Sequence, residues 1–154
     1  MKVSAVVVSH GHVEELERSL PALASQVDEV VVVANTPGSI GAVSGEAVRV
    51  LENSRPLSLA ANVNLGIAAT SGEWVLSANP DAIPEPGAVA ELVAVADAKP
   101  RCGIAGPELR WPDGTWQPSR RRFPTVGGTI VRRTPLRRLR GEYAQRDHYL
   151  LDER

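Results

Sequence analysis

Short valine-rich runs that alternate with amphipathic stretches constrain the fold of this chain more than any other feature. Val3–Ser9 and Glu29–Ala34 are runs dominated by valine, which is typical of parallel strands buried on both faces. Between them, apolar residues recur at helical spacing over residues 13–23, with charged residues on the other side. The chain therefore predicts the order strand, helix, strand at its start.

The same alternation continues through the following residues. We expect strands at residues 48–51, 74–78 and 102–105, a helix from residue 59 that ends near residue 71, and a helix that follows Pro86. Residues 109–111 and 115–117 flank a turn at Gly114 and predict a hairpin. The pattern as a whole predicts an α/β, Rossmann-like fold with a mostly parallel sheet and helices on both faces.

The composition suits one compact domain without disulfides. The chain has 154 residues, 43% of them hydrophobic, and its single cysteine, Cys102, cannot form an intramolecular disulfide. The apolar run at residues 3–8 is too short for a signal peptide, and no apolar stretch reaches the roughly 20 residues that a membrane span needs. We therefore expect a cytoplasmic protein in which Cys102 is a small buried residue.

The charge is distributed unevenly along the chain. Residues 1–100 carry 5 basic and 12 acidic side chains, whereas residues 101–154 carry 12 arginines and 6 acidic side chains. Arginine clusters attract phosphates and anionic lipid, but a solvated, weakly structured tail has the same composition. We expect a ligand-binding domain at residues 1–125 and a basic, weakly structured extension at residues 126–154.

Polar residues follow each of the first four predicted strands. They are Ser9, His10, Gly11 and His12 after the first strand, Asn35 and Thr36 after the second, Asn53, Ser54 and Arg55 after the third, and Asn79 and Asp81 after the fourth. In an open parallel sheet, ligands bind in the crevice at the carboxyl ends of the strands. The side chains of this set suit a base and a ribose, and the set contains one carboxylate.

That carboxylate, Asp81, favours a divalent metal. It follows a predicted strand beside the rigid Pro80. Mg²⁺ and Mn²⁺ are commonly held by one or two carboxylates, and phosphate oxygens complete the coordination shell. Such an ion would neutralise the charge that develops on a nucleoside diphosphate leaving group. The alternative is that Asp81 only caps a turn.

Other motifs, present or absent, narrow the class of protein and the kind of site. Neither a GxGxxG pattern nor a P-loop follows the first strand, which argues against an NAD enzyme and a P-loop kinase. His10 and His12 lack the third donor that a zinc site needs. Asn62 and Asn64 interrupt an apolar helix, and because they lie about 200° apart on it they do not easily serve one ligand. A hydrogen bond from one of them to a neighbouring loop is the alternative.

As an ordered set, these segments resemble the family-two glycosyltransferases, and within them the rhamnosyltransferase-like group. The matching stretches are AVVVSH at residues 5–10, residues 29–35 with Ser39 beyond them, AANVNLG at residues 60–66, GEWVL at residues 72–76, Asn79-Pro80-Asp81, and residues 106–125 from Gly106-Pro107 through Asp113-Gly114 to Arg121-Arg122-Phe123-Pro124-Thr125. The resemblance covers nearly the whole chain. It implies a GT-A fold and an inverting transfer of a sugar from a nucleoside diphosphate to a hydroxyl acceptor.

The resemblance also implies roles for particular positions. Ser9 and His10 lie where the family contacts the nucleobase, and Asn35 lies where it contacts base or ribose. Asp81 stands at the family's metal-binding carboxylate, which implies Mg²⁺ or Mn²⁺, and Asn79 replaces the first acid of the Asp-x-Asp motif. The Asn-Pro-Asp form is similar to that of rhamnosyltransferases that use dTDP-rhamnose. The remaining donor-binding candidates are Asn62, Asn64, Arg121 and Arg122.

The chain departs from the family pattern in two places. Ala34 stands where the family usually has an aspartate. Family members continue into an apolar segment and a Glu-Asp pair whose aspartate deprotonates the acceptor, whereas this sequence ends at Arg154. We therefore assign no catalytic residue, and expect the donor half of such an enzyme, which binds donor but transfers sugar poorly by itself.

The resemblance implies a nucleoside-diphosphate sugar and a lipid-linked or polysaccharide acceptor of the cell envelope as partners. The arginine tail adds an expected contact with the inner face of the membrane. A homodimer is expected because a domain cut short of its last elements would expose apolar surface and tend to pair. We expect no nucleic acid, since no reader motif occurs. The alternative function is a non-catalytic nucleotide-sugar binding module, which differs from the enzyme in transferring no sugar.

Overall fold

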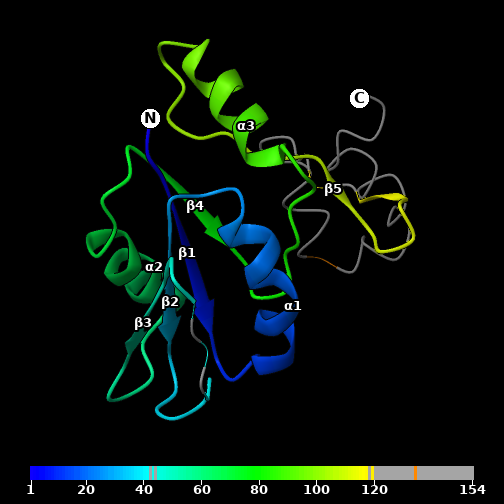
Figure 1. Cartoon of the computed structure of the whole chain (residues 1–154). Coiled ribbons are helices and arrows are strands. Elements are labelled where there is room, and N and C mark those ends of the chain that lie inside the picture. The colour runs from blue at the N-terminus through cyan, green and yellow to red at the C-terminus, as the bar shows by residue number, and fades with distance from the viewer. Residues whose placement is uncertain (42, 44, 118, 120–133, 135–154) are drawn as a thin grey trace. The chain divides into compact units, whose positions relative to one another are not determined.

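Figure 1 shows the computed structural model of the chain, which describes residues 1–41, 43, 45–117, 119 and 134. The chain forms two compact units, residues 1–105 and residues 106–154. The predicted boundary at residue 125 and, except for Thr134, the predicted extension at residues 126–154 lie outside the described residues.

The first unit contains four strands and three helices in the predicted order. They are β1 (Val3–Ser9), α1 (Val13–Ala24), β2 (Glu29–Ala34), β3 (Val48–Glu52), α2 (Leu59–Ala68), β4 (Trp74–Ala78) and α3 (Ala88–Asp97). The strands form one fully parallel sheet in the order β3-β2-β1-β4. The predicted α/β fold with a parallel sheet is therefore confirmed. No helix in the described residues has the length and apolar character that crossing a bilayer requires.

Helices cover both faces of the sheet because alternate side chains of each strand point to opposite faces. On one face, Leu16 and Leu20 of α1 pack against a cluster that includes Val7 and Val32. On the other face, Val63 of α2 packs against the valines of β1 and β2 that point the opposite way. Figure 1 shows α1 and α2 on the two sides of the sheet. The central strands are buried on both sides, which explains their valine-rich sequences.

The buried face of α2 differs from the apolar stripe that its sequence suggests. Leu59 is 66% exposed and Ile67 is 43% exposed, whereas Asn62 and Gly66 are buried. A Cβ atom on Gly66 would overlap Cγ1 of Val6. The missing side chain therefore lets the helix backbone approach the sheet closely.

The strand expected at residues 102–105 does not form. Cys102 is partly buried, as a free thiol, and Ile104 is 93% exposed. β4 therefore has no strand on its outer side within the described residues. The segment is only four residues long and contains Gly103, which has no side chain to pack and weakens a strand.

The second unit begins with the predicted hairpin. β5 (Leu109–Arg110) pairs antiparallel with β6 (Trp116–Gln117). Gly114 adopts a φ of 81°, which favours glycine in the turn. The Thr115 hydroxyl and amide donate to the Asp113 carboxylate and lower the pKa of Asp113.

A carboxylate network holds the amino edge of the sheet. Glu29 accepts hydrogen bonds of 2.7 Å from the Ser4 hydroxyl and from the backbone amide and hydroxyl of Ser71. The Ser4 hydroxyl also accepts from the amide of Gly72, where a Cβ atom would collide with the backbone of Ser4. The hydrogen bonds from Ser4 and Ser71 lower the pKa of Glu29 from 4.5 to about 2. The network therefore ties the start of β4 to β1 and β2.

This network predicts a loss of stability in acid. Because the pKa of Glu29 is lowered by folding, the contribution of its carboxylate is complete above pH 4.5 and is lost as the pH falls towards 2. Glu29→Gln should therefore lower the free energy of unfolding by about 2 kcal/mol at pH 7. Urea unfolding at several pH values would measure this. A mutant whose stability falls between pH 5 and pH 2 as steeply as that of the parent would contradict the assignment.

Candidate functional site

The carboxyl ends of the parallel strands form a polar edge of the sheet. The chain adds β2 and β3 on one side of β1 and then crosses to add β4 on the other side. Open α/β sheets bind ligands at such a switch point. In the sheet register, Ser9 lies beside Ala34 and Val7 lies beside Ala78. The polar residues that follow the four strands therefore meet at one edge, as the sequence predicts.

The loop after β1 is organised by Ser9. Its side chain is buried, and its hydroxyl accepts hydrogen bonds from the amides of Gly11 at 3.3 Å and His12 at 3.1 Å. Gly11 has a φ of 105°, so the turn suits glycine. The amide of His10 donates to Nδ1 of His12 at 3.2 Å. Ser9 thus shapes the loop, and the loop carries two exposed imidazoles at the edge of the sheet.

Three asparagines form a hydrogen-bonded cluster at the carboxyl ends of β2 and β3. One follows β2, one follows β3 and one lies in α2. Asn35, Asn53 and Asn62 are 1%, 7% and 0% exposed. Asn53 Nδ2 donates to Oδ1 of Asn35 at 2.9 Å and to Oδ1 of Asn62 at 2.6 Å. Asn35 also bonds to the backbone of Leu57 and to the ring of His10. We call these three residues the amide cluster.

The residues after β4 form a turn that carries Asp81. The amide of Ala82 donates to the carbonyl of Asn79 at 3.1 Å. The hydroxyl of Ser19, a buried residue of α1, donates to the carbonyl of Pro80 at 2.6 Å and anchors the turn to this helix. The Asn79 and Asp81 side chains are exposed. The turn therefore offers a free carboxylate beside the end of β1.

This carboxylate fits a metal that is shared with a ligand better than a metal held by protein alone. Among the described residues, no group of three or more histidine, cysteine, aspartate or glutamate side chains could hold an ion. Mg²⁺ sites that are completed by substrate phosphates need only one or two protein carboxylates. Asp81 can supply one, and Asn79 a neutral oxygen.

The predicted site residues fall into two groups. Ser9, Asn35 and Asn62 are buried, whereas His10, Asn64, Asn79 and Asp81 are exposed. Asn62 and Asn64 have different surroundings, in keeping with their angular separation on α2. Arg121 and Arg122 lie outside the described residues. The direct ligand contacts expected of all these residues stay predictions.

Three features of the site were not assigned from the sequence. Ser19 anchors the Asp81 turn, Asn53 bridges the other two asparagines, and the backbone of Leu57 is bound by Asn35. The signal for Ser19 was a hydroxyl on the apolar face of a predicted helix. Neither Asn53 nor Leu57 gave a signal for these particular contacts, because their partners are 9 to 22 residues away in the sequence.

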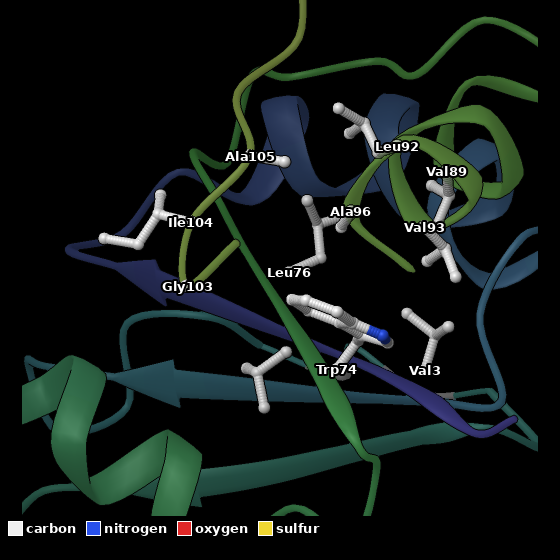
Figure 2. Close-up of a pocket in the computed structure, with 11 residues that line it drawn as sticks. Val3, Trp74, Leu76, Val89, Leu92, Val93, Ala96, Gly103, Ile104 and Ala105 are labelled. Carbon is white, nitrogen blue, oxygen red and sulfur yellow. The ribbon is translucent and has the colours of Figure 1, made fainter. Parts of the chain in front are cut away.

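Figure 2 shows a cavity of about 140 Å³ beside β4. Val3, Trp74 and Leu76 line it from the sheet, and Leu92 lines it from α3. Its lining is apolar, and Val3 and Trp74 are the first residues of their strands, so it lies away from the carboxyl edge. It therefore has no part in the polar site.

The fold and the polar edge define an α/β domain with a parallel sheet and a cluster of polar side chains at its switch point. Residues 4–151 match the family described as glycosyl transferase family 2. The chain belongs to this family.

Two proteins resemble the chain in sequence. The chain is 34% identical over 144 residues to the N-acetylglucosaminyl-diphospho-decaprenol L-rhamnosyltransferase of Mycobacterium tuberculosis, a match that covers 82% of this chain and 46% of the relative. It is 30% identical over 128 residues to the uncharacterized protein y4gI of Sinorhizobium fredii, covering 75% of this chain and 14% of the relative. The chain thus matches less than half the length of these relatives.

Two solved structures share the fold. The mannosyltransferase PcManGT from Pyrobaculum calidifontis, in complex with GDP-Man and Mn²⁺, aligns with a TM-score of 0.54 and 22% identity over 64% of this chain and 33% of that one. TarS 1-349 from S. aureus aligns with a TM-score of 0.51 and 20% identity, again over 64% of this chain and 33% of that one. The predicted GT-A fold is therefore confirmed.

Proposed function

We propose that this chain forms the donor site of a glycosyltransferase and binds a nucleoside-diphosphate sugar at the carboxyl edge of β1 and β4. The observation that carries the proposal is the meeting of the His10 loop and the Asp81 turn at the switch point of a family-two domain. The imidazoles offer hydrogen bonds to a base, and the carboxylate offers a charge for a metal diphosphate. Family membership and this arrangement support the same ligand class.

A divalent metal belongs to the proposal. Asp81, helped by Asn79, would hold Mg²⁺ or Mn²⁺ together with the diphosphate of the donor. When bound, such an ion neutralises the negative charge that develops on the departing diphosphate. The Ser19 hydroxyl keeps the turn in place for this purpose. The complex of PcManGT with GDP-Man and Mn²⁺ supports the choice of metal.

The particular donor sugar and acceptor that we propose are chosen by analogy with the Mycobacterium tuberculosis relative. Its name gives L-rhamnose as the sugar and N-acetylglucosaminyl-diphospho-decaprenol as the acceptor. We therefore propose dTDP-rhamnose as donor and a polyprenyl-diphosphate-linked sugar as acceptor in cell-envelope synthesis. Contact with the inner face of the membrane through the arginines beyond residue 119, a cytoplasmic location and a homodimer belong to the same proposal.

Thermal unfolding with candidate nucleotides tests donor binding. A ligand that binds only the folded state at about 100 times its Kd stabilises it by about 2.7 kcal/mol, which raises the Tm by roughly 5–10 °C. We expect such a shift with dTDP, and a larger one when Mn²⁺ is added. UDP and GDP serve as comparisons for the base. The absence of a shift with all three nucleotides, with and without Mn²⁺, would contradict the proposal.

Transfer separates the enzyme from a non-catalytic binding module. Incubation with dTDP-rhamnose and a polyprenyl-diphosphate-linked N-acetylglucosamine should yield a rhamnosylated lipid if the chain, alone or with a partner, is catalytic. Clear donor binding without any product, under all conditions in which a full-length relative is active, would favour the binding module.

A further inference from the structure

We propose that the amide cluster is a positioning device for nucleotide binding, which fixes the backbone at Leu57 and holds the exposed His10 ring at the carboxyl edge of the sheet. The proposal rests on the proposed function for the class of ligand. Asn35, Asn53 and Asn62 are 1%, 7% and 0% exposed. The positioning role acts through the two exposed residues that they hold, Leu57 and His10.

The orientation of the Asn35 amide is set by the backbone of Leu57. The Leu57 amide can only donate, so the Asn35 atom that lies 2.7 Å from it is the oxygen Oδ1. The nitrogen Nδ2 then donates to the Leu57 carbonyl at 3.0 Å. A single side chain therefore binds both polar backbone groups of one residue, much as a neighbouring strand would. The loop between β3 and α2 cannot slide without breaking both bonds.

The other two asparagines reinforce this orientation. Oδ1 of Asn35 accepts a second hydrogen bond, from Asn53, and Nδ2 of Asn53 also donates to Asn62. Asn62 Nδ2 also donates to the Leu57 carbonyl, at 3.4 Å, so the hydrogen bonds among the three asparagines begin and end at Leu57. Each amide thus fixes the direction of the next. Burying three amides is unfavourable unless they are all satisfied, so a cluster of this kind has one arrangement.

The arrangement also holds the ring of His10. Nδ2 of Asn35 lies 3.1 Å from Nδ1 and 3.5 Å from Nε2 of that ring, so the amide packs against the ring between its two nitrogens. The imidazole cannot turn without losing this contact. Nδ1 of His12 accepts a hydrogen bond from the His10 amide, so the proton of the neutral His12 ring lies on Nε2. Nε2 of His12 is therefore a donor, which fits an acceptor on the ligand, such as a base carbonyl or a phosphate oxygen.

Asn35→Asp tests the positioning role with the smallest change in shape. The aspartate keeps an oxygen for the Leu57 amide and Asn53, but it replaces the donor by an oxygen that faces the Leu57 carbonyl and His10. Calorimetric titration with dTDP and Mn²⁺ should show an affinity about tenfold lower than that of the parent, since one or two net hydrogen bonds are lost. Glu29→Gln is the matched control, because it removes a polar network at the opposite edge and should leave the affinity unchanged. Equal affinities of Asn35→Asp and the parent would overturn the proposal.

A second measurement needs no ligand. Nitrogen-15 spectra of the histidine rings, recorded where the rings are neutral and assigned with His10→Gln, should show His10 signals that differ between Asn35→Asp and the parent, because a carboxylate replaces the amide against the ring. The His12 signals should change less, since no hydrogen bond in the described part of the chain joins Asn35 to that ring. Identical His10 signals in the two proteins would overturn the proposal. Failure of the parent to bind any nucleotide would instead contradict the proposed function, and the spectra would still decide whether the amide cluster fixes the ring.

Discussion

Replacing Asp81 by asparagine should remove the Mn²⁺-dependent part of nucleoside-diphosphate binding and weaken the affinity measured in Mn²⁺ roughly a hundredfold, or about 2.7 kcal/mol. The side chain is exposed, so the substitution keeps the shape and the fold and removes only the charge. An amide oxygen is a weaker ligand for a hard divalent ion than a carboxylate. Titration of the mutant and the parent with dTDP, with and without Mn²⁺, would measure the difference.

Two further variants make the Asp81 test specific. Glu85→Gln removes another exposed carboxylate four residues further along the chain and should leave the Mn²⁺ effect intact. Ser19→Ala removes the hydroxyl that anchors the Pro80 carbonyl and should weaken Mn²⁺-dependent binding by a few fold, since it loosens the turn without touching the ligand. If Mn²⁺ strengthens binding equally in Asp81→Asn and the parent, the ion is held elsewhere.

The strands could be predicted from the sequence because the burial of a strand is visible in its own apolar residues. Val3–Ser9, Glu29–Ala34 and Trp74–Ala78 form strands with the predicted bounds. The first two are central strands covered on both faces, so valine-rich runs identify them without knowledge of their neighbours. The position of the site could be predicted from the same strands, because the residues that follow parallel strands all lie at the carboxyl edge of the sheet.

The details of the site depend on distant pairs and could not be predicted in the same way. A helical pattern does not say that Asn62 points inward and Asn64 outward, because that depends on which face of α2 meets the sheet. The apolar residues Leu59 and Ile67 suggested a different face. The deciding feature was Gly66, whose lack of a side chain brings the helix close enough for Asn62 to reach Asn53.

Gly66→Ala should therefore destabilise the domain by about 2–3 kcal/mol, although alanine is the better helix former by about 1 kcal/mol. The new Cβ would overlap Cγ1 of Val6 and lie 3.3 Å from Cγ2 of Val33, both in the rigid centre of the sheet. The helix must move outward, which also stretches the bond between Asn62 and Asn53. Urea unfolding should show the loss, and the Tm should fall by roughly 10 °C.

A double-mutant cycle identifies overcrowding as the cause. Val6→Ala removes the methyl groups that Gly66→Ala would strike, so the double mutant should be more stable than the sum of the two single effects by at least about 1 kcal/mol. Gly103→Ala is the control, because no atom lies within 4 Å of the Cβ position there, and it should change stability by less than about 0.5 kcal/mol. Additive effects at the two positions, or a gain in stability for Gly66→Ala alone, would show that α2 does not depend on this close approach. The amide cluster would then need another explanation for how Asn62 reaches Asn53.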